Sequence, residues 1–361
     1  MKVLVVKTSS LGDVIHTLPA LTDAARAIPG VRFDWLVEEN FAEVPAWHPA
    51  VERVIPVALR RWRRSVLRTW LAGEWQAMTR SVKLADYDLV IDAQGLIKSA
   101  ILTRYAGAPV HGLDRASIRE PLASRFYDQR HAVAKGRHAV ERVRELFAKA
   151  LGYDKPDTPC DYGLERTRVF GDAPPPATPT LLFLHGTTWA TKHWPEMYWR
   201  DLTERCTRAG WQLRLPWGND AERERAERIA ANLSGVTVLP RLTLAGIAGE
   251  LAGAAACVAV DTGLGHLAAA LDVPTVSLFG PTRPELTGAW GPRQRHLASD
   301  FPCAPCLSAR CRHYPTKDEL ARFDVVREKP LCYTRLEPDR VFAELSALVN
   351  ESGRPAPETA R

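Results

Sequence analysis

The sequence predicts an α/β protein of two Rossmann-like domains that face each other across a cleft. Three observations support this prediction. Short apolar runs alternate with helix-like segments in the first half, the alternation restarts in the second half, and a proline-rich segment separates the two. This β–α–β order favours parallel sheets that are covered by helices on both faces.

The first half opens on the apolar run VLVVK and a helical pattern that stops at Pro29-Gly30. Further runs rich in Val, Ile and Leu are typical of strands that are buried on both faces. The predicted strands are 3–7, 32–39, 52–58 and 89–95, and the first helix is predicted over 14–28.

The segment VFGDAPPPATPT interrupts this alternation because its prolines cannot continue a helix or a central strand. It is therefore the expected linker. We expect an N-terminal Rossmann-like domain at 1–168, a linker at 169–180, a C-terminal Rossmann-like domain at 181–340 with a cysteine-containing insertion at 299–335, and a C-terminal helix with a disordered tail at 341–361.

The second half repeats the strand and helix pattern. Strands are predicted at 180–186, 212–218, 256–263 and 274–280, with helices after Pro195, over NDAERERAERIAANL and from Leu264. Ligands of open parallel sheets collect at the carboxyl ends of the strands. The polar residues that follow these strands are therefore the candidate site.

The composition is that of a folded globular protein, with 361 residues of which 46% are hydrophobic and 25% charged. Seven cysteines are few and odd in number, which favours a reducing compartment. The chain has no signal-peptide pattern and no apolar run of the ~18 residues that a membrane span needs, so we expect it in the cytoplasm. Its net charge of +6 favours an anionic partner: nucleic acid, phospholipid or a phosphorylated substrate.

The strongest site signal is VAVDTGLGHLAAAL, residues 258–271. A strand is predicted to end at Asp261, and the helix that follows offers the backbone N–H groups of residues 262–264 to an anion. The alternative is a helix that Asp261 or Thr262 simply caps. The residues alone leave both interpretations open.

The loop TTWATKHWP, residues 187–195, gives a similar signal after another strand. Thr187 and Thr188 offer hydroxyl groups, and Lys192 can neutralise a phosphate. Lys192 can equally be an exposed loop lysine. Glu222 lies in the first turn of a later helix, where an acid suits the helix dipole or can hydrogen-bond a ribose.

Asp13 stands in KTSSLGDVIHTLPAL, the turn between the first strand and the first helix. It can cap that helix. It can also act as a general base, because a carboxylate accepts a proton from a hydroxyl within hydrogen-bonding distance. The helix N-terminus favours its charged form, which makes it a weak base that takes the proton late.

Taken together, six segments resemble the ADP-heptose:lipopolysaccharide heptosyltransferase family, and within it the group of type I enzymes. They are KTSSLGDVIHTLPALTDA, IDAQGLIKSA, REPLASRFY, HAVERVRELFAKALGY, KHWPE and VDTGLGHLAAALD. The resemblance is nearly collinear from Met1 to about Thr282. It implies a GT-B fold, with acceptor bound by the N-terminal and donor by the C-terminal domain.

The same resemblance implies an activity. L-glycero-D-manno-heptose would pass from ADP-heptose to a Kdo hydroxyl of Kdo–lipid A with inversion, and neither a metal ion nor another cofactor would be needed. By matching position, Asp13 becomes the catalytic base, and Lys98 and Arg119 meet acidic groups of the acceptor. The donor would be held by Thr187, Thr188, Lys192, Thr262 and Gly263 at the diphosphate, Glu222 at the ribose, and Asp261 and His266 near the heptose.

The basic stretch RRWRRSVLRTWLAGEW, residues 60–75, has two interpretations. With helical spacing, Trp62, Val66 and Trp70 share one face. The stretch is then a solvated helix packed by its aromatic side chains, or a contact to anionic lipid. A membrane-lipid acceptor favours the second, which places the protein peripherally on the cytoplasmic face of the inner membrane and makes acceptor contacts of Arg60, Arg61, Arg63 and Arg64.

Four cysteines lie in the predicted insertion, in the pattern Cys303-x2-Cys306-x4-Cys311 followed by Cys332. Four thiols can bind zinc in a closed structural site, or they can be buried free thiols. In either case we expect this segment to lie away from the chemistry.

Three other functions compete with the main hypothesis. A type II heptosyltransferase would use the same donor on a heptose acceptor. A nicotinamide oxidoreductase also has Rossmann-like halves, but the first strand lacks the fingerprint G-x-G-x-x-G and is followed by Gly12 alone. A non-catalytic binder of anionic lipid or sugar would leave Asp13 dispensable. The main hypothesis includes no nucleic-acid partner.

Overall fold

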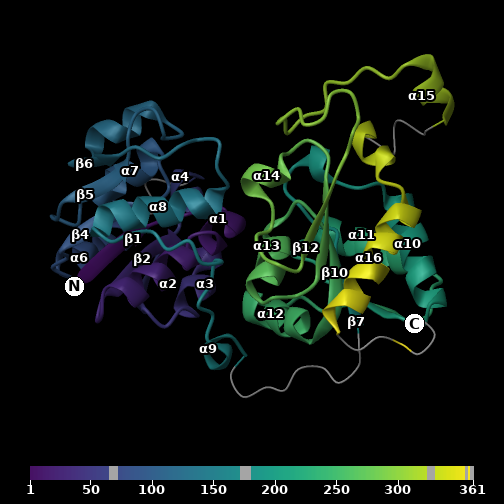
Figure 1. Cartoon of the computed structure of the whole chain (residues 1–361), viewed down its shortest axis with the longest axis horizontal. Helices are drawn as coiled ribbons and strands as arrows, with labels where there is room; N and C mark the ends of the chain where they lie inside the picture. Colours follow the sequence, from purple (N-terminus) through teal and green to yellow (C-terminus); the bar gives the residue numbers. More distant parts are fainter. Residues whose placement is uncertain (65–71, 171–179, 323–329, 354–356, 358–361) are drawn as a thin grey trace. The chain divides into compact units, whose positions relative to one another are not determined.

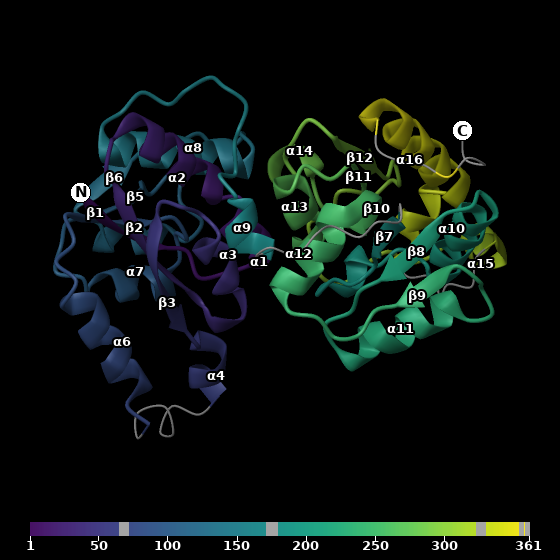
Figure 2. The same cartoon turned by 90° about the horizontal axis from the view of Figure 1, so that it is seen from below.

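The computed structural model describes residues 1–64, 72–170, 180–322, 330–353 and 357. The chain divides into two compact units, Met1–Val169 (unit 1) and Phe170–Arg361 (unit 2). Each unit is a parallel six-stranded sheet with helices on both faces, as the prediction expected (Figures 1 and 2). Most of the predicted linker, 171–179, lies outside the described residues.

Unit 1 has the strand order β3-β2-β1-β4-β5-β6. Its strands are β1 (Lys2–Val6), β2 (Arg32–Glu38), β3 (Val51–Val57), β4 (Leu89–Asp92), β5 (Val110–Leu113) and β6 (Gln129–His131). Its helices are α1 (Leu11–Ile15), α2 (Leu18–Ala27), η1 (Glu39–Phe41), α3 (Glu43–Ala46), α4 (Leu59–Arg64), α6 (Glu74–Lys83), α7 (Ile97–Thr103), η2 (Pro121–Phe126), α8 (Ala139–Leu151) and α9 (Arg166–Phe170).

Unit 2 repeats the design with the strand order β12-β11-β10-β7-β8-β9. Its strands are β7 (Thr180–Leu184), β8 (Gln212–Leu215), β9 (Val236–Val238), β10 (Ala254–Val260), β11 (Thr275–Phe279) and β12 (Gln294–Ala298). Its helices are η3 (Ala190–Lys192), α10 (Glu196–Arg208), α11 (Asp220–Ala230), α12 (Leu244–Gly253), α13 (Gly263–Ala270), α14 (Pro284–Thr287), α15 (Lys317–Arg322), η4 (Leu331–Arg335) and α16 (Pro338–Ser352).

Strand periodicity explains how each sheet is covered. Successive side chains of a strand point to opposite faces, and β7 and β10 are buried at every position. One set, which includes Phe183 and Val258, packs against α10, α11 and α16. The other set meets α12 and α13, where a Cβ on Gly265 would come within 3.3 Å of Ala259.

The predicted helix over 14–28 is wrong in two respects: the segment forms two helices, and the first begins three residues earlier. α1 begins at Leu11 and ends at Ile15, and α2 begins at Leu18. Pro19 has no N–H to donate to Ile15, so one continuous helix would lose a hydrogen bond at that point. The first of the two helices, α1, includes Asp13, whereas the predicted helix began after it.

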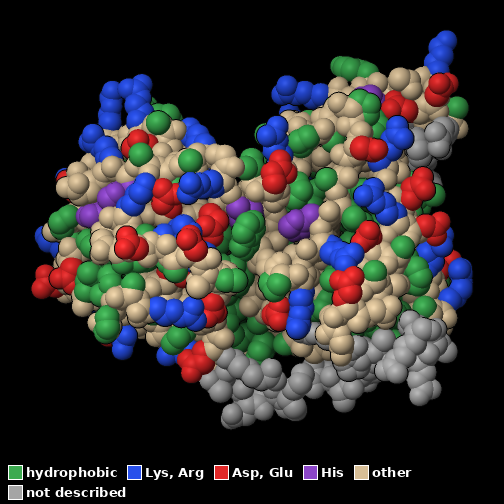
Figure 3. All heavy atoms as spheres, viewed as in Figure 1, with side chains coloured by type: hydrophobic (Ala, Val, Ile, Leu, Met, Phe, Trp, Pro, Cys, Tyr) green, Lys and Arg blue, Asp and Glu red, His purple; other side chains and the backbone are tan. Residues whose placement is uncertain are grey.

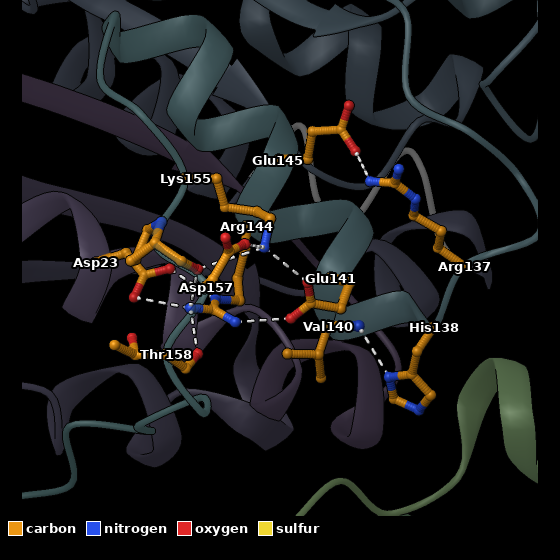
Figure 4. Close-up of polar contacts among 11 residues, drawn as sticks. Asp23, Arg137, His138, Val140, Glu141, Arg144, Glu145, Lys155, Asp157 and Thr158 are labelled. Carbon is orange, nitrogen blue, oxygen red and sulfur yellow. Dashed lines mark hydrogen bonds and ion pairs between the residues drawn. The ribbon is translucent and has the colours of Figure 1, made fainter.

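A buried ion pair connects two helices of unit 1. Arg144 of α8 donates through Nε to Asp23 of α2 at 2.6 Å, and both side chains are only 2% exposed. Figure 4 shows the same guanidinium bonded to Glu141 and to the carbonyl of Thr158. The pair is thus enclosed by further hydrogen bonds, which a buried pair needs to offset its desolvation.

None of the helices in the described part of the chain is long and apolar enough to cross a membrane. Acidic and basic side chains are interspersed over most of the face shown in Figure 3, and a group of basic side chains stands at the upper end of unit 1.

Candidate active site

In unit 2 the candidate donor residues gather after the strands β7, β8 and β10. Asp261 follows β10 and is 7% exposed. Its Oδ2 lies 2.7 Å from Nζ of Lys192 and accepts a hydrogen bond from Thr282 at 2.6 Å. Thr187 donates to the backbone carbonyl of Asp261 at 3.1 Å. Side chains from two segments, the one between β7 and α10 and the one after β11, therefore converge on Asp261.

The helix that follows Asp261 begins as the sequence predicted. Thr262 is the N-cap of α13 and has extended backbone angles, and Gly263 is the first helical residue. The hydroxyl of Thr262 makes no capping bond to this helix. Thr188 is exposed on the neighbouring loop, and His266 is buried one turn into α13.

Glu222 lies in the first turn of α11, where Asn219 caps the helix. Its Oε2 accepts the backbone N–H of Gly218 at 2.8 Å. A Cβ on Gly186 would come within 2.7 Å of the Glu222 carboxyl carbon. Glycine at 186 therefore lets this carboxylate lie against the end of β7.

Two histidines near this carboxylate were not anticipated. His185 directly follows β7, and burial lowers its pKa to about 3. His193 precedes α10; burial and the Arg225 guanidinium lower its pKa to about 4. Arg225 donates to Nδ1 of His193 at 3.0 Å, so this nitrogen is unprotonated. Their only sequence signal was their position after a strand.

In unit 1 Asp13 lies in α1, with a side chain that is 45% exposed. Its Oδ2 accepts from the backbone N–H of Ser10 at 2.9 Å and from the Ser10 hydroxyl at 2.8 Å. Its Oδ1 is 3.8 Å from Nζ of Lys7, a lysine that is nearly buried. Asp13 is therefore not the N-cap of a helix that begins at Val14: it is the third residue of α1 and bonds back to the N-cap residue Ser10. Its other oxygen faces a cation.

Lys98 and Arg119 are both exposed on neighbouring elements of unit 1. Lys98 lies in the first turn of α7, and Arg119 lies in the loop after β5. Glu120 joins the two elements because its carboxylate accepts the N–H of Ile97 at 2.7 Å. Both cations thus stand near the carboxyl ends of β4 and β5.

The basic stretch is only partly described, because residues 65–71, which include Val66, Arg68 and Trp70, lie outside the described residues. Trp62 is 7% exposed and donates to Glu74 at 2.7 Å, so it packs on unit 1. Arg61 is bound at 2.8 Å to Glu74 and at 3.1 Å to Glu39. Arg60, Arg63 and Arg64 of the same helix are exposed as well.

The cysteine segment is closer to the donor residues than expected. Thr191, beside Lys192, donates to the backbone carbonyl of Ser308 at 2.7 Å. The expectation that this segment lies away from the candidate site is therefore wrong, because its loop supports the loop of Lys192. All four cysteines line one cavity of about 350 Å³. Among the described residues, however, no three His, Cys, Asp or Glu side chains are arranged to hold a metal ion.

Residues 75–317 match the family model of glycosyltransferase family 9 (heptosyltransferase). The chain belongs to this family. Over its full length it is 65% identical to lipopolysaccharide heptosyltransferase 1 of Pseudomonas aeruginosa, and the two chains are covered completely.

Solved structures agree with this assignment. Escherichia coli heptosyltransferase WaaC with ADP superimposes with a TM-score of 0.79 at 52% identity, over 83% of this chain and 93% of that one. The structure with ADP-2-deoxy-2-fluoro heptose has a TM-score of 0.80 at 45% identity, over 98% and 100% of the two chains. By contrast, lipopolysaccharide heptosyltransferase 2 of Salmonella typhimurium is 23% identical over 98% of this chain and 100% of its own. The fold is thus the GT-B fold that the sequence predicted.

Proposed function

We propose that this family 9 heptosyltransferase moves L-glycero-D-manno-heptose from ADP-heptose to a Kdo hydroxyl of Kdo–lipid A in inner-core synthesis. The full-length similarity to heptosyltransferase 1 supports this acceptor over a heptose acceptor. Unit 1 then binds the acceptor, unit 2 binds the donor, and the linker at 169–180 joins them. The reaction takes place at the cytoplasmic face of the inner membrane.

Unit 2 supplies the groups that stabilise the departing ADP. Lys192 and the first N–H groups of α13 offer positive charge and free donors to the diphosphate. Preorganised donors of this kind contribute about 2.7–4 kcal/mol each to transition-state stabilisation. Thr187 and Thr188 add hydroxyl groups, and Glu222 accepts from the ribose.

Asp261 has two roles in this proposal. In the structure its Oδ2 is bonded to Lys192 and to Thr282. A bound diphosphate competes with Asp261 for the lysine, because both are anions. The released carboxylate then accepts hydroxyl groups of the heptose, with His266 beside it. Donor binding and sugar recognition are coupled through one ion pair.

Bond changes follow the inverting course. The bond between the anomeric carbon and the phosphate oxygen breaks, and ADP leaves with the electron pair. The acceptor oxygen forms its bond to the opposite face, and its proton passes to Asp13. A positioned base of this type contributes about 10²–10⁴ in rate. Lys98 and Arg119 pair with acidic groups of the acceptor.

The decisive experiment is mass spectrometry of the products from ADP-heptose with Kdo–lipid A and, separately, with heptosyl–Kdo–lipid A. We expect one added heptose on the first acceptor and none on the second. Transfer to the second acceptor alone would support the type II activity instead. Asp13→Asn should bind ADP with unchanged affinity by calorimetry and lose about 10²–10⁴ in turnover; near-wild-type turnover would remove Asp13 from its role.

A peripheral membrane contact through Arg60, Arg63 and Arg64 is part of the proposal. These arginines are exposed on α4, and near an anionic surface each is worth about 1 kcal/mol. Arg63→Glu with Arg64→Glu should reduce binding to vesicles of anionic lipid. The matched control is Arg80→Glu with Lys83→Glu on the exposed side of α6. Equal binding by both double variants would contradict the contact.

A further inference from the structure

The turn that carries Asp13 is held by a side chain from a distant part of unit 1. Oε1 of Gln94 accepts the backbone N–H of Thr8 at 2.9 Å and that of Ser9 at 3.1 Å. These two residues join β1 to α1, directly before Ser10 and Asp13. Because two backbone donors meet one atom, that atom is the amide oxygen and not its nitrogen.

The backbone of Gln94 is held in turn by the side chain of Asp92. This carboxylate is fully buried at the end of β4. Its Oδ1 accepts the N–H groups of Gln94 at 2.9 Å and Gly95 at 3.1 Å, and its Oδ2 accepts the hydroxyls of Ser99 at 2.9 Å and Tyr127 at 2.8 Å. A buried carboxylate with four partners holds one orientation of the turn after β4.

Gly95 further restricts the backbone conformation of this turn. Its φ of +69° lies in the left-handed region, and a Cβ there would come within 2.9 Å of Ile118. A side chain at this position would therefore be strained twice. The direction in which Gln94 leaves the sheet is thus set by backbone geometry as well as by Asp92.

A second contact ties the same two turns together. Nζ of Lys7 donates to the carbonyl of Ala93 at 2.8 Å and lies 3.8 Å from Oδ1 of Asp13. Oδ2 of Asp13 is held by Ser10. The carboxylate therefore takes its position from two neighbouring residues, Lys7 and Ser10, which lie on either side of the two amides that Gln94 holds.

We propose that Gln94 is a positioning residue for sugar transfer: its side-chain carbonyl fixes the backbone at Thr8 and Ser9 and thereby sets the position of the Asp13 carboxylate that receives the acceptor proton. This inference rests on the proposed role of Asp13. A displacement of about 1 Å in a reacting group can cost about 10² in rate. A neutral amide holds the turn without adding a negative charge near Asp13, which would raise the pKa of that carboxylate.

The test compares two substitutions of similar size. Gln94→Met keeps the length of the side chain and removes the acceptor, so we expect kcat to fall about ten- to a hundredfold while the KM for ADP-heptose stays within about twofold. Gln94→Glu restores the acceptor and most of kcat. The acidic limb of its kcat–pH profile should move to higher pH because of the added charge. Gln76→Met, on the exposed side of α6, is the control.

A kcat of Gln94→Met within about twofold of the wild type would overturn the proposal. So would a rise confined to the acceptor KM, because Gln94 would then be an acceptor contact. If Gln94→Met fails to fold, Tyr127→Phe removes one of the two hydroxyls that donate to Asp92, and kcat should fall without a change in donor KM; unchanged kcat would again oppose the proposal.

A double variant separates this inference from the proposed base. In an Asp13→Asn background, Gln94→Met should have no further effect on kcat, because the group that it positions is absent. A fully multiplicative loss would show that Gln94 acts independently of Asp13. If Asp13→Asn alone keeps its turnover, the proposed base fails whatever Gln94 does.

Discussion

Two ion pairs of similar length differ in what surrounds them. Arg144 and Asp23 of unit 1 are 2.6 Å apart and both 2% exposed; Lys192 and Asp261 of unit 2 are 2.7 Å apart and 17% and 7% exposed. The Arg144 guanidinium also bonds to Glu141 and to two backbone carbonyls. In the described part of the chain, Lys192 forms its ion pair with Asp261.

The difference separates a structural pair from a pair that can exchange partners. The Arg144 pair lies between two long helices, and its donors are directed at protein groups (Figure 4). Lys192 ends the single turn η3 between β7 and α10, and an ammonium group has three donors. Removing a partner should therefore affect stability in unit 1 and nucleotide binding in unit 2.

The largest effect is expected for Arg144→Met. It leaves Asp23 charged and buried without its cation, which costs about 3–5 kcal/mol of unfolding free energy. The urea transition of unit 1 measures this loss, with hydrogen exchange of α2 and α8 as the local readout. The control is Arg137→Met, because Arg137 is 56% exposed and its pair with Glu145 is worth at most about 1 kcal/mol. Equal losses of unfolding free energy in the two variants would show that the buried pair stabilises unit 1 no more than the exposed pair does.

Lys192→Met should have the next largest effect, and on another quantity. Without the ammonium group, kcat/KM for ADP-heptose should fall about 10²–10³-fold, and ADP should bind more weakly. The unfolding free energy should change by less than it does for Arg144→Met, because Asp261 keeps the Thr282 bond. Unchanged ADP affinity by calorimetry would contradict the phosphate assignment.

Acid should weaken unit 1 through His48. Its Nδ1 accepts the N–H of Ala50 at 3.1 Å and its Nε2 lies 3.0 Å from the Thr22 hydroxyl, while burial lowers its pKa from 6.5 to about 4. Between pH 6.5 and 4 the unfolded chain takes up a proton that the folded chain does not, so stability falls as pH falls. The loss from pH 7 to pH 5 is about 2 kcal/mol.

The variant His48→Asn tests this pH dependence. An Asn side chain can accept the N–H two residues on, as His48 does, and it cannot titrate. Its unfolding free energy should depend less steeply on pH below 6.5, by up to one proton. An unaltered slope would assign the acid sensitivity to other groups.

Much of the fold could be predicted from the amino-acid sequence. Strands that are buried on both faces are continuous apolar runs, so β1, β2, β7 and β10 were predicted to within about two residues at most ends. The short edge strands β6, β9 and β12 were not predicted, because three to five residues with mixed polarity carry little signal. Pairing with a neighbouring strand, rather than local pattern, makes them strands.

The residues of the candidate site also divide into those that the sequence predicts and those that it does not. Asp13, Lys192 and Asp261 were singled out because polar residues after a strand are informative in a parallel sheet. Gln94 and Thr282 were missed, because each acts on a residue far away in sequence, as in the bond from Thr8 to Gln94 across 86 positions. A single sequence gives no sign of which distant loops the strand order brings together.

The smallest effect is expected for Thr282→Val, which tests the environment of the Lys192–Asp261 pair. The substitution removes the hydroxyl that donates to Oδ2 of Asp261 and keeps the shape of the side chain. A hydrogen bond to a charged group is worth about 1.5–3 kcal/mol, and the bond from Lys192 still holds Asp261 in the variant.

We therefore expect the KM for ADP-heptose to rise about three- to tenfold in Thr282→Val while ADP affinity stays near the wild-type value, because the proposed function assigns Asp261 to the sugar and Lys192 to the diphosphate. Thr287→Val is the matched control, since Thr287 is exposed on α14 and bonds only weakly to its own helix, at 3.4 Å. A parallel loss of ADP and ADP-heptose affinity would mean that Thr282 acts on the diphosphate through Lys192, and that Asp261 takes no part in recognising the sugar.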